Sequence, residues 1–114
     1  MINIILFLVA WLLIPPLTIR NLFSVKKKYG NTKGYFRSTA LSIDIWGNRE
    51  FRTLWNTKLR IENGYEFGKI GETISSALGK NERDKTLSKN GKILVKILDF
   101  LDEGHCQKSI NENI

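Results

Sequence analysis

Residues 1–19 read MINIILFLVAWLLIPPLTI, a run without any charged side chain in which Asn3 and Thr18 are the only polar ones. A helix rises ~1.5 Å per residue, so a run of this length spans about 27 Å and approaches the ~30 Å hydrocarbon core of a bilayer. The remaining chain is too small to wrap a helix that is apolar on every side. We therefore predict that residues 1–25 form a transmembrane anchor.

The ends of this run distinguish a retained anchor from a cleaved signal peptide, which starts with basic residues and ends in a small-x-small cleavage site. The run has neither feature, so we expect the anchor to stay on the chain. Pro15 and Pro16 predict a kinked helix, because proline lacks the amide donor and its ring clashes with the preceding turn. The alternative is that only the part up to Ile14 enters the bilayer and that residues 17–25 lie along its surface.

Positive charge is concentrated directly after the anchor. Between Arg20 and Arg60 there are ten Lys or Arg and two acidic residues, a net charge of +8. Because basic flanking segments stay in the cytoplasm, we predict a single-pass inner-membrane protein with its N-terminus outside and its C-terminus in the cytoplasm. Basic side chains beside the membrane are also expected to contact anionic lipid headgroups or other phosphates. The candidates for this contact are Arg20, Lys26, Lys27, Lys28, Lys33 and Arg37.

The rest of the chain predicts a small all-helical cytoplasmic domain, so the expected fold class is mostly α with one Pro-kinked N-terminal transmembrane helix. Residues 26–34, KKKYGNTKG, contain two glycines and four lysines and predict a flexible, basic juxtamembrane linker. The domain is expected to cover residues 35–110. A flexible tail is expected at residues 111–114.

Several helices are predicted inside the domain from their spacing and their caps. Residues 35–46 fit a helix better than a strand, and Gly47-Asn48 predicts a turn before a helix that runs from Phe51 to a polar break at 62–64. Residues 71–79 predict a short helix closed by Gly79. Residues 86–103 predict an amphipathic helix with Thr86 as N-cap and Gly104 at its end. Its expected apolar stripe comprises Leu87, Leu94, Ile97, Leu98 and Leu101.

Reactive side chains are few and unfavourably spaced. Cys106 is the only cysteine, so no intrachain disulfide can form and a reducing compartment fits best. His105 and Cys106 follow several acidic residues, but neighbouring residues on a helix point ~100° apart and cannot easily share one metal ion or one reaction. We expect a buried Cys106 and a His105 that caps the preceding helix, with no catalytic residue, metal or cofactor. A metal or thiol site at His105 and Cys106 is the outside alternative.

Aromatic side chains are interleaved with the basic residues. Trp46, Phe51 and Trp55 are expected in the core, with docking to the lipid surface as the alternative. Tyr29, Tyr35 and Phe36 could stack on bases while Lys and Arg hold phosphates, so a membrane-tethered nucleic-acid-binding protein is a second functional hypothesis. No known recognition motif accompanies this pattern.

Two longer segments carry a resemblance: ETISSALGKN at 72–81 and LDFLDEGHCQKSI at 98–110, together with SID at 42–44, Gly47-Asn48 and TLS at 86–88. This combination resembles a group of small proteins of tailed phages and prophages. The resemblance implies a phage-encoded protein of a bacterial host and assigns no reaction. The motif residues expected to serve the core or to contact a partner are Asp44, Asn48, Glu72, Asp102, His105 and Cys106.

The function expected from these features is that of a non-enzymatic, membrane-anchored interaction protein. It would bind another protein or itself at the cytoplasmic face of the host inner membrane, where phage proteins of this size affect superinfection, lysis or the host envelope. A role in superinfection, lysis or the host envelope follows only by analogy with other phage proteins of this size.

Overall fold

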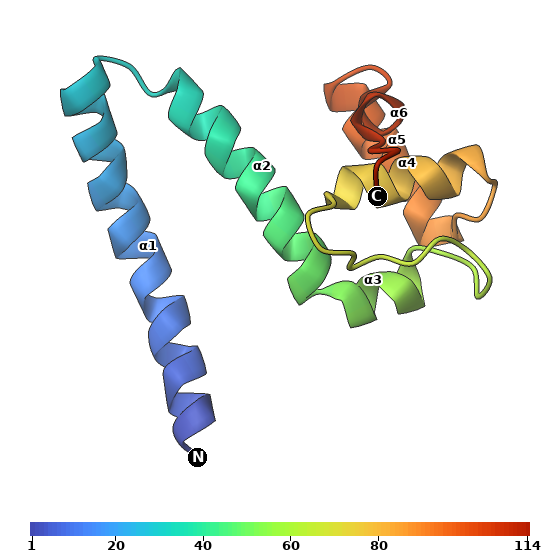
Figure 1. Ribbon diagram of the computed structural model, residues 1–114, viewed down its shortest axis with the longest axis horizontal. Coiled ribbons are helices and arrows are strands. Elements are labelled where there is room, and N and C mark those ends of the chain that lie inside the picture. Colours follow the sequence, from blue (N-terminus) through green and yellow to red (C-terminus); the bar gives the residue numbers. More distant parts are fainter. The chain divides into compact units, whose positions relative to one another are not determined.

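The computed structural model describes all 114 residues, which form six α-helices and no strand. The predicted mostly-α fold class is therefore confirmed. The chain divides into two compact units, Met1–Thr39 and Ala40–Ile114. Figure 1 shows the helices in chain order.

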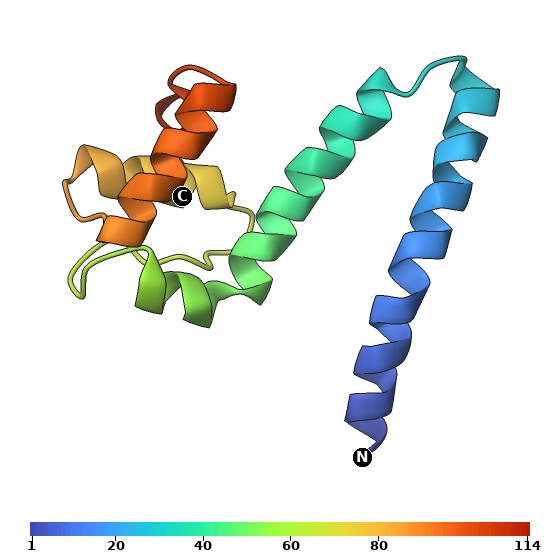
Figure 2. The ribbon, with the colours of Figure 1, turned by 180° about the vertical axis from the view of Figure 1, so that it is seen from behind.

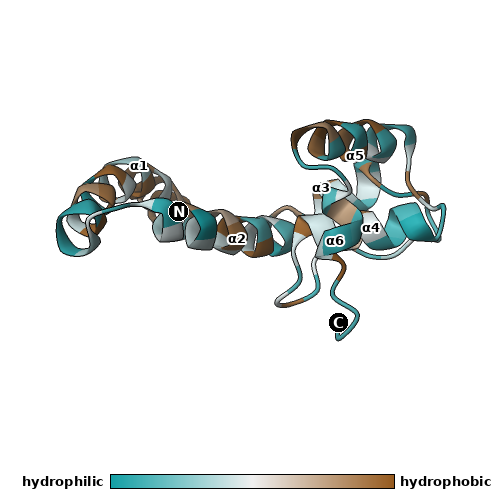
Figure 3. Cartoon of the chain, turned by 90° about the horizontal axis from the view of Figure 1, so that it is seen from above, coloured by the Kyte–Doolittle hydropathy of each residue, from teal (hydrophilic) through white to brown (hydrophobic).

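The first unit consists mainly of α1 (Ile2–Tyr29), which is long and apolar enough to cross a membrane and has no buried residue. Figure 3 shows hydrophobic residues along this helix. The helix continues through Pro15 and Pro16, so residues 17–25 belong to the same helix as residues 2–14. The alternative in which residues 17–25 lie along the bilayer surface stays a prediction. Gly30 ends the helix in the left-handed conformation, at φ 81°.

The predicted linker at 26–34 is mostly helical, which corrects the expected anchor and linker boundaries. Lys26, Lys27 and Lys28 form the last turn of α1, and α2 (Lys33–Glu50) starts three residues after Gly30. Cations in the last turn of a helix are favoured by the negative end of its dipole, which explains why three lysines extend the helix instead of ending it. Only residues 30–32 lie outside the two helices.

The second unit starts within α2 and continues into α3 (Arg52–Lys58). The predicted turn at Gly47-Asn48 is wrong, because both residues lie inside α2 and are buried. A Cβ atom on Gly47 would lie 3.3 Å from Ile74 Cδ1, so this helix and the start of α4 are in close contact at Gly47. Of the aromatics expected in the core, Trp55 packs against it, whereas Trp46 and Phe51 are partly exposed.

Residues 59–73 contain no helix and return beside α3 (Figure 2) to the start of α4 (Ile74–Arg83). Thr73 is the N-cap of α4 and accepts a hydrogen bond from the Ser76 amide. Gly79 was predicted to end this helix, but it lies in its middle, where a Cβ atom would lie 2.3 Å from the Cys106 carbonyl oxygen. Its role is to allow close approach of α6.

The last two helices, α5 (Lys89–Leu101) and α6 (His105–Ser109), pack against α4 and against each other. Ser88, not Thr86, is the N-cap of α5, and its hydroxyl accepts from the Gly91 amide. Gly104 has φ 66° and precedes α6, while α5 itself ends at Asp102.

The side of α5 that packs against the core differs from the predicted stripe. Val95 is buried, and Leu94 and Leu98 pack beside it, whereas Ile97 and Leu101 are exposed. The difference arises because the helix is apolar on two sides, and periodicity alone does not determine which side meets the core.

The chain end is also attached to the domain, contrary to the prediction of a flexible tail at 111–114. The Asn111 amide donates to Ser76 Oγ at 2.9 Å, and Glu112 forms an ion pair with Arg83. Both contacts tie the end of the chain to α4.

Candidate functional site

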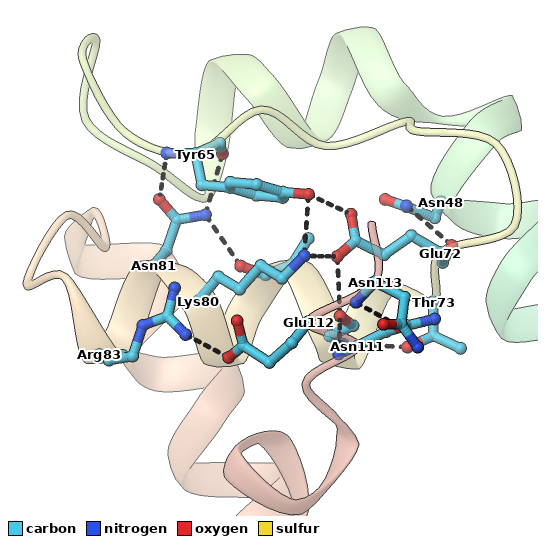
Figure 4. Close-up of polar contacts among 12 residues, drawn as sticks. Asn48, Tyr65, Glu72, Thr73, Lys80, Asn81, Arg83, Asn111, Glu112 and Asn113 are labelled. Carbon is cyan, nitrogen blue, oxygen red and sulfur yellow. Dashed lines mark hydrogen bonds and ion pairs between the residues drawn. The ribbon is translucent and has the colours of Figure 1, made fainter.

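The most deeply buried charged group is Glu72, which has no exposed surface. Its Oε1 accepts a hydrogen bond from the Tyr65 hydroxyl at 2.9 Å, and its Oε2 accepts one from Ser76 Oγ at 2.7 Å. Lys80 Nζ lies 2.7 Å from the same Oε2 and also donates to the Tyr65 hydroxyl at 3.0 Å (Figure 4). The carboxylate charge is therefore met by one cation and two hydroxyl donors.

The ammonium group of Lys80 is fixed by the same neighbours. Burial alone disfavours the cation, but the hydrogen bonds to Glu72 and Tyr65 and the negative charge of Glu72 outweigh it and raise the pKa of Lys80 above its ordinary 10.5. Its Nζ also lies 4.5 Å from the centre of the Tyr65 ring, within cation–π range. Every charge in this cluster is compensated inside the protein, so the cluster holds the segment 59–73 against α4.

Two asparagines complete this attachment through the backbone. Asn48 Nδ2 donates to the Glu72 carbonyl at 2.9 Å, and its Oδ1 accepts from the Gly68 amide at 3.1 Å. Asn81 binds Tyr65 in the same two-sided way, accepting from its amide at 2.9 Å and donating to its carbonyl at 3.0 Å (Figure 4). The irregular segment thus obtains from side chains the hydrogen bonds that a helix would supply from its own backbone.

A second polar cluster lies at the N-terminal end of α4 and joins it to α2 and α6. Ser75 Oγ lies 3.1 Å from Asp44 Oδ2 and 3.0 Å from His105 Nε2. The other ring nitrogen, His105 Nδ1, lies 3.0 Å from Asp102 Oδ2. Asp102 also meets Lys108, whose hydrogen bond, followed by that of His105, holds the pKa of Asp102 below its ordinary 3.8.

Serine, histidine and aspartate in this order resemble the arrangement of a hydrolase triad, but the hydrogen-bond directions differ. In a triad the histidine accepts the serine proton. Here the Ser75 hydroxyl lies between Asp44 and His105 and donates to the Asp44 carboxylate, so its proton is not directed to the imidazole.

The surroundings of Ser75 also differ from those of a nucleophile. Ser75 is buried, with only 4% of its surface exposed. The adjacent amides are engaged, since Ile74 N donates to Asp44 Oδ1 at 2.7 Å and Ser76 N donates to Thr73 Oγ1 at 2.9 Å. An oxyanion needs free amide donors, so this geometry is suited to joining three helices.

Cys106 is completely buried between α6 and α4. Burial, followed by the negative charges of Asp99, Glu82 and Asp44, raises the pKa of its thiol from 9.0 to about 12. The thiolate is the form that reacts and binds metals, and this environment disfavours it. Burial of Cys106 was predicted correctly, whereas His105 does not cap the preceding helix but bonds through its side chain to Ser75 and Asp102.

The basic residues predicted to contact headgroups or phosphates belong to the first unit, whereas both clusters belong to the second. All six are exposed and occupy the last turns of α1 and the first turns of α2. Their contact with lipid headgroups or phosphates remains a prediction.

The six motif residues are distributed over the two clusters and the core. Asp44 and His105 contact Ser75, and Asp102 contacts His105. Asn48 donates to the carbonyl of Glu72, and Cys106 belongs to the hydrophobic core. Sequence reasoning missed Tyr65, Ser75, Lys80 and Asn81. The spacing of Ser76 and Lys80 by four residues predicts that they share one face of a helix, and Glu72 directly precedes the N-cap of that helix, Thr73.

No known protein family, no curated protein and no solved structure matches the chain.

Proposed function

We propose that this protein is a single-pass inner-membrane protein whose helical C-terminal domain acts, without catalysing a reaction, as an interaction module at the cytoplasmic face. Its partner would be another protein or a second copy of the chain. The proposal includes a phage origin, based on the resemblance carried by residues 72–81 and 98–110, and a role in superinfection, lysis or the host envelope by analogy.

The observation that carries the proposal is α1 itself. None of its 28 residues is buried, and its large apolar side chains between Ile2 and Ile19 are exposed. Apolar side chains exposed over a whole helix are stable in lipid and unfavourable in water. The basic residues at its C-terminal end favour a cytoplasmic location for the rest of the chain.

The proposal of a non-enzymatic domain is supported by the way its polar groups are used. Glu72 and Lys80 neutralise each other, the Ser75 proton goes to Asp44, and the Cys106 thiol stays protonated. These contacts stabilise a rigid domain and leave its surface to serve recognition. A fluorophosphonate probe, which labels activated serines, is expected to leave Ser75 unmodified, and labelling at Ser75 would contradict this part of the proposal.

Topology is the first test. A reporter that is active only in the cytoplasm, fused after Ile114, is expected to work, whereas one active only in the periplasm is expected to fail. Neutral replacements of Arg20, Lys26, Lys27 and Lys28 should weaken this preference, and replacement of the same number of lysines at 85, 89, 92 and 96 should leave it unchanged. A periplasmic C-terminus in the unmodified chain would overturn the cytoplasmic assignment.

Interaction is tested in the host membrane. Expression of the full chain is expected to change superinfection or lysis timing, and cross-linking in intact membranes should recover the same partner, or a dimer of the chain, repeatedly. A freely soluble protein that turns over a substrate would refute the proposal as a whole.

A second candidate function, binding of nucleic acid, is favoured by one groove in the C-terminal unit. The groove has a volume of about 590 Å³, and Arg49, Arg52 and Lys69 line it together with Glu66. Excess positive charge of this kind attracts phosphates. DNA or RNA affinity that falls steeply with salt, and that is reduced by Arg52→Gln but not by the distant Lys85→Gln, would support this candidate. Absence of binding at low salt would remove it.

A further inference from the structure

The helix α5 has two apolar sides, and only one of them is used inside the domain. Gly91 and Val95 are buried on the inner side, with Leu94 and Leu98 packed beside them. On the outer side Ile93 and Ile97 are about half exposed, and Phe100 and Leu101 are 89% and 74% exposed. Figure 3 shows hydrophobic colouring on this helix. A continuous exposed apolar face on a small domain indicates an interaction surface.

The charged side chains of α5 indicate which kind of partner its outer apolar face can bind. At ~100° per residue, Lys89, Lys92 and Lys96 fall on one flank of the outer apolar face, and Asp99 falls beside Lys92 at the inner edge of that flank. Lys92, Lys96 and Asp99 line a groove of about 420 Å³ together with Lys85 and Glu82. The flank therefore carries three exposed lysines and one half-buried carboxylate, so its net charge is positive.

This combination is typical of a helix that lies in the surface of an anionic membrane. The apolar side chains enter the boundary between headgroups and acyl chains, and the lysines meet the phosphates. Pairing of the same face with a second copy would instead bring two sets of three lysines close together. Charge complementarity thus favours lipid over self-association.

We propose that the outer face of α5, formed by Ile93, Ile97, Phe100 and Leu101, docks on an anionic lipid surface. The proposal rests on the proposed function, because α1 in the bilayer would keep the domain within reach of the headgroups. Docking gives the protein a second membrane contact besides α1 and fixes which side of the domain faces a cytoplasmic partner.

The test uses the full chain in vesicles and a single environment-sensitive fluorophore attached through Phe100→Cys. The buried Cys106, with its raised thiol pKa, stays unlabelled in the folded protein, so the label enters only at position 100. Glu62→Cys, on an exposed part of the segment 59–73, is the matched control. Vesicles contain either phosphatidylcholine alone or a mixture with phosphatidylglycerol, each with and without quencher-bearing acyl chains.

The expected result is blue-shifted emission and quenching by the lipid-borne quencher at position 100, and neither at position 62. Both effects should be stronger in phosphatidylglycerol vesicles. Replacing Lys89, Lys92 and Lys96 by Gln should reduce the docking equilibrium constant by at least about tenfold, since each lysine near an anionic surface contributes roughly a factor of five. Ile93→Gln with Ile97→Gln should abolish quenching.

Two outcomes would overturn the proposal. In the first, the fluorophore at position 100 shows the emission of a water-exposed label in both kinds of vesicle. In the second, it is shielded from water only at high protein density and is not quenched by the lipid-borne quencher. The second result would assign the face to self-association. Vesicle flotation separates this failure from failure of the proposed function, because a chain anchored by α1 floats whether α5 docks or not. A chain that does not float would overturn both.

Discussion

The close packing of α4 against α6 can be tested at Gly79, where the substitution Gly79→Ala adds a single methyl group. An added Cβ atom would lie 2.3 Å from the Cys106 carbonyl oxygen and 2.8 Å from Ile110 Cγ1. Ordinary contacts are longer than about 3.4 Å, so α6 would have to move by roughly 1 Å relative to α4. Because the nearest atom belongs to the backbone, no side-chain rotation can relieve the contact.

The expected effect of Gly79→Ala is a balance of two terms. Alanine is favoured over glycine inside a helix by about 1 kcal/mol, whereas overpacking a tight contact costs typically about 1–3 kcal/mol and occasionally more. With a backbone contact this short, we expect the upper part of that range and a net loss of about 1–2 kcal/mol in the free energy of unfolding. For a small domain this loss lowers the Tm by roughly 4–15 °C.

Unfolding of the full chain in a mild detergent can be followed by urea titration with tryptophan fluorescence from Trp46 and Trp55, and by the labelling rate of Cys106. Gly34→Ala is the matched control, because nothing lies within 4 Å of its added Cβ atom in α2. It is expected to stabilise its helix by up to about 1 kcal/mol. If Gly79→Ala also stabilises the protein, the close approach of α4 and α6 is refuted.

Three further outcomes are expected. Lys80→Met should lower the free energy of unfolding by about 3–5 kcal/mol, because it leaves Glu72 charged and buried. Adding Glu72→Gln to this variant should restore part of the loss. If the effects of the two substitutions simply add, the double-mutant cycle contradicts the ion pair. Asn48→Ala should lower the free energy of unfolding, measured by urea titration, by roughly 1–3 kcal/mol for each backbone group that loses its partner. The Cys106 thiol, with a folded pKa of about 12 against 9.0 unfolded, should make stability fall as pH rises through this window, by about 1.4 kcal/mol per pH unit. Comparison with Cys106→Ala isolates this slope from the alkaline effect of Lys80, and equal slopes in the two proteins would contradict the buried thiol.

The candidate site could be predicted only in part from the sequence. Glu72, Asp102, His105 and Cys106 were predicted to serve the core or to contact a partner, and the burial of Cys106 followed from its type. The pairing could not be predicted, because Ser75 meets Asp44 across 31 positions and His105 across 30. A hydroxyl or a lysine in a helix reads as a surface residue unless its distant partner is known, which is why Ser75 and Lys80 were missed.

The long apolar helix, the position of the positive charge and the mostly-α fold could all be predicted from the sequence, since each depends on composition or on spacing within one helix turn. The tertiary structure alone decided the roles of the glycines. Gly79 and Gly91 look like helix breaks, yet each lies where a Cβ atom would meet the backbone of another segment, Cys106 in one case and Leu59 in the other. It also decided which side of α5 is buried. The physical reason is the same in each case: local periodicity specifies a helix and its faces, whereas burial depends on segments that come together only when the chain folds.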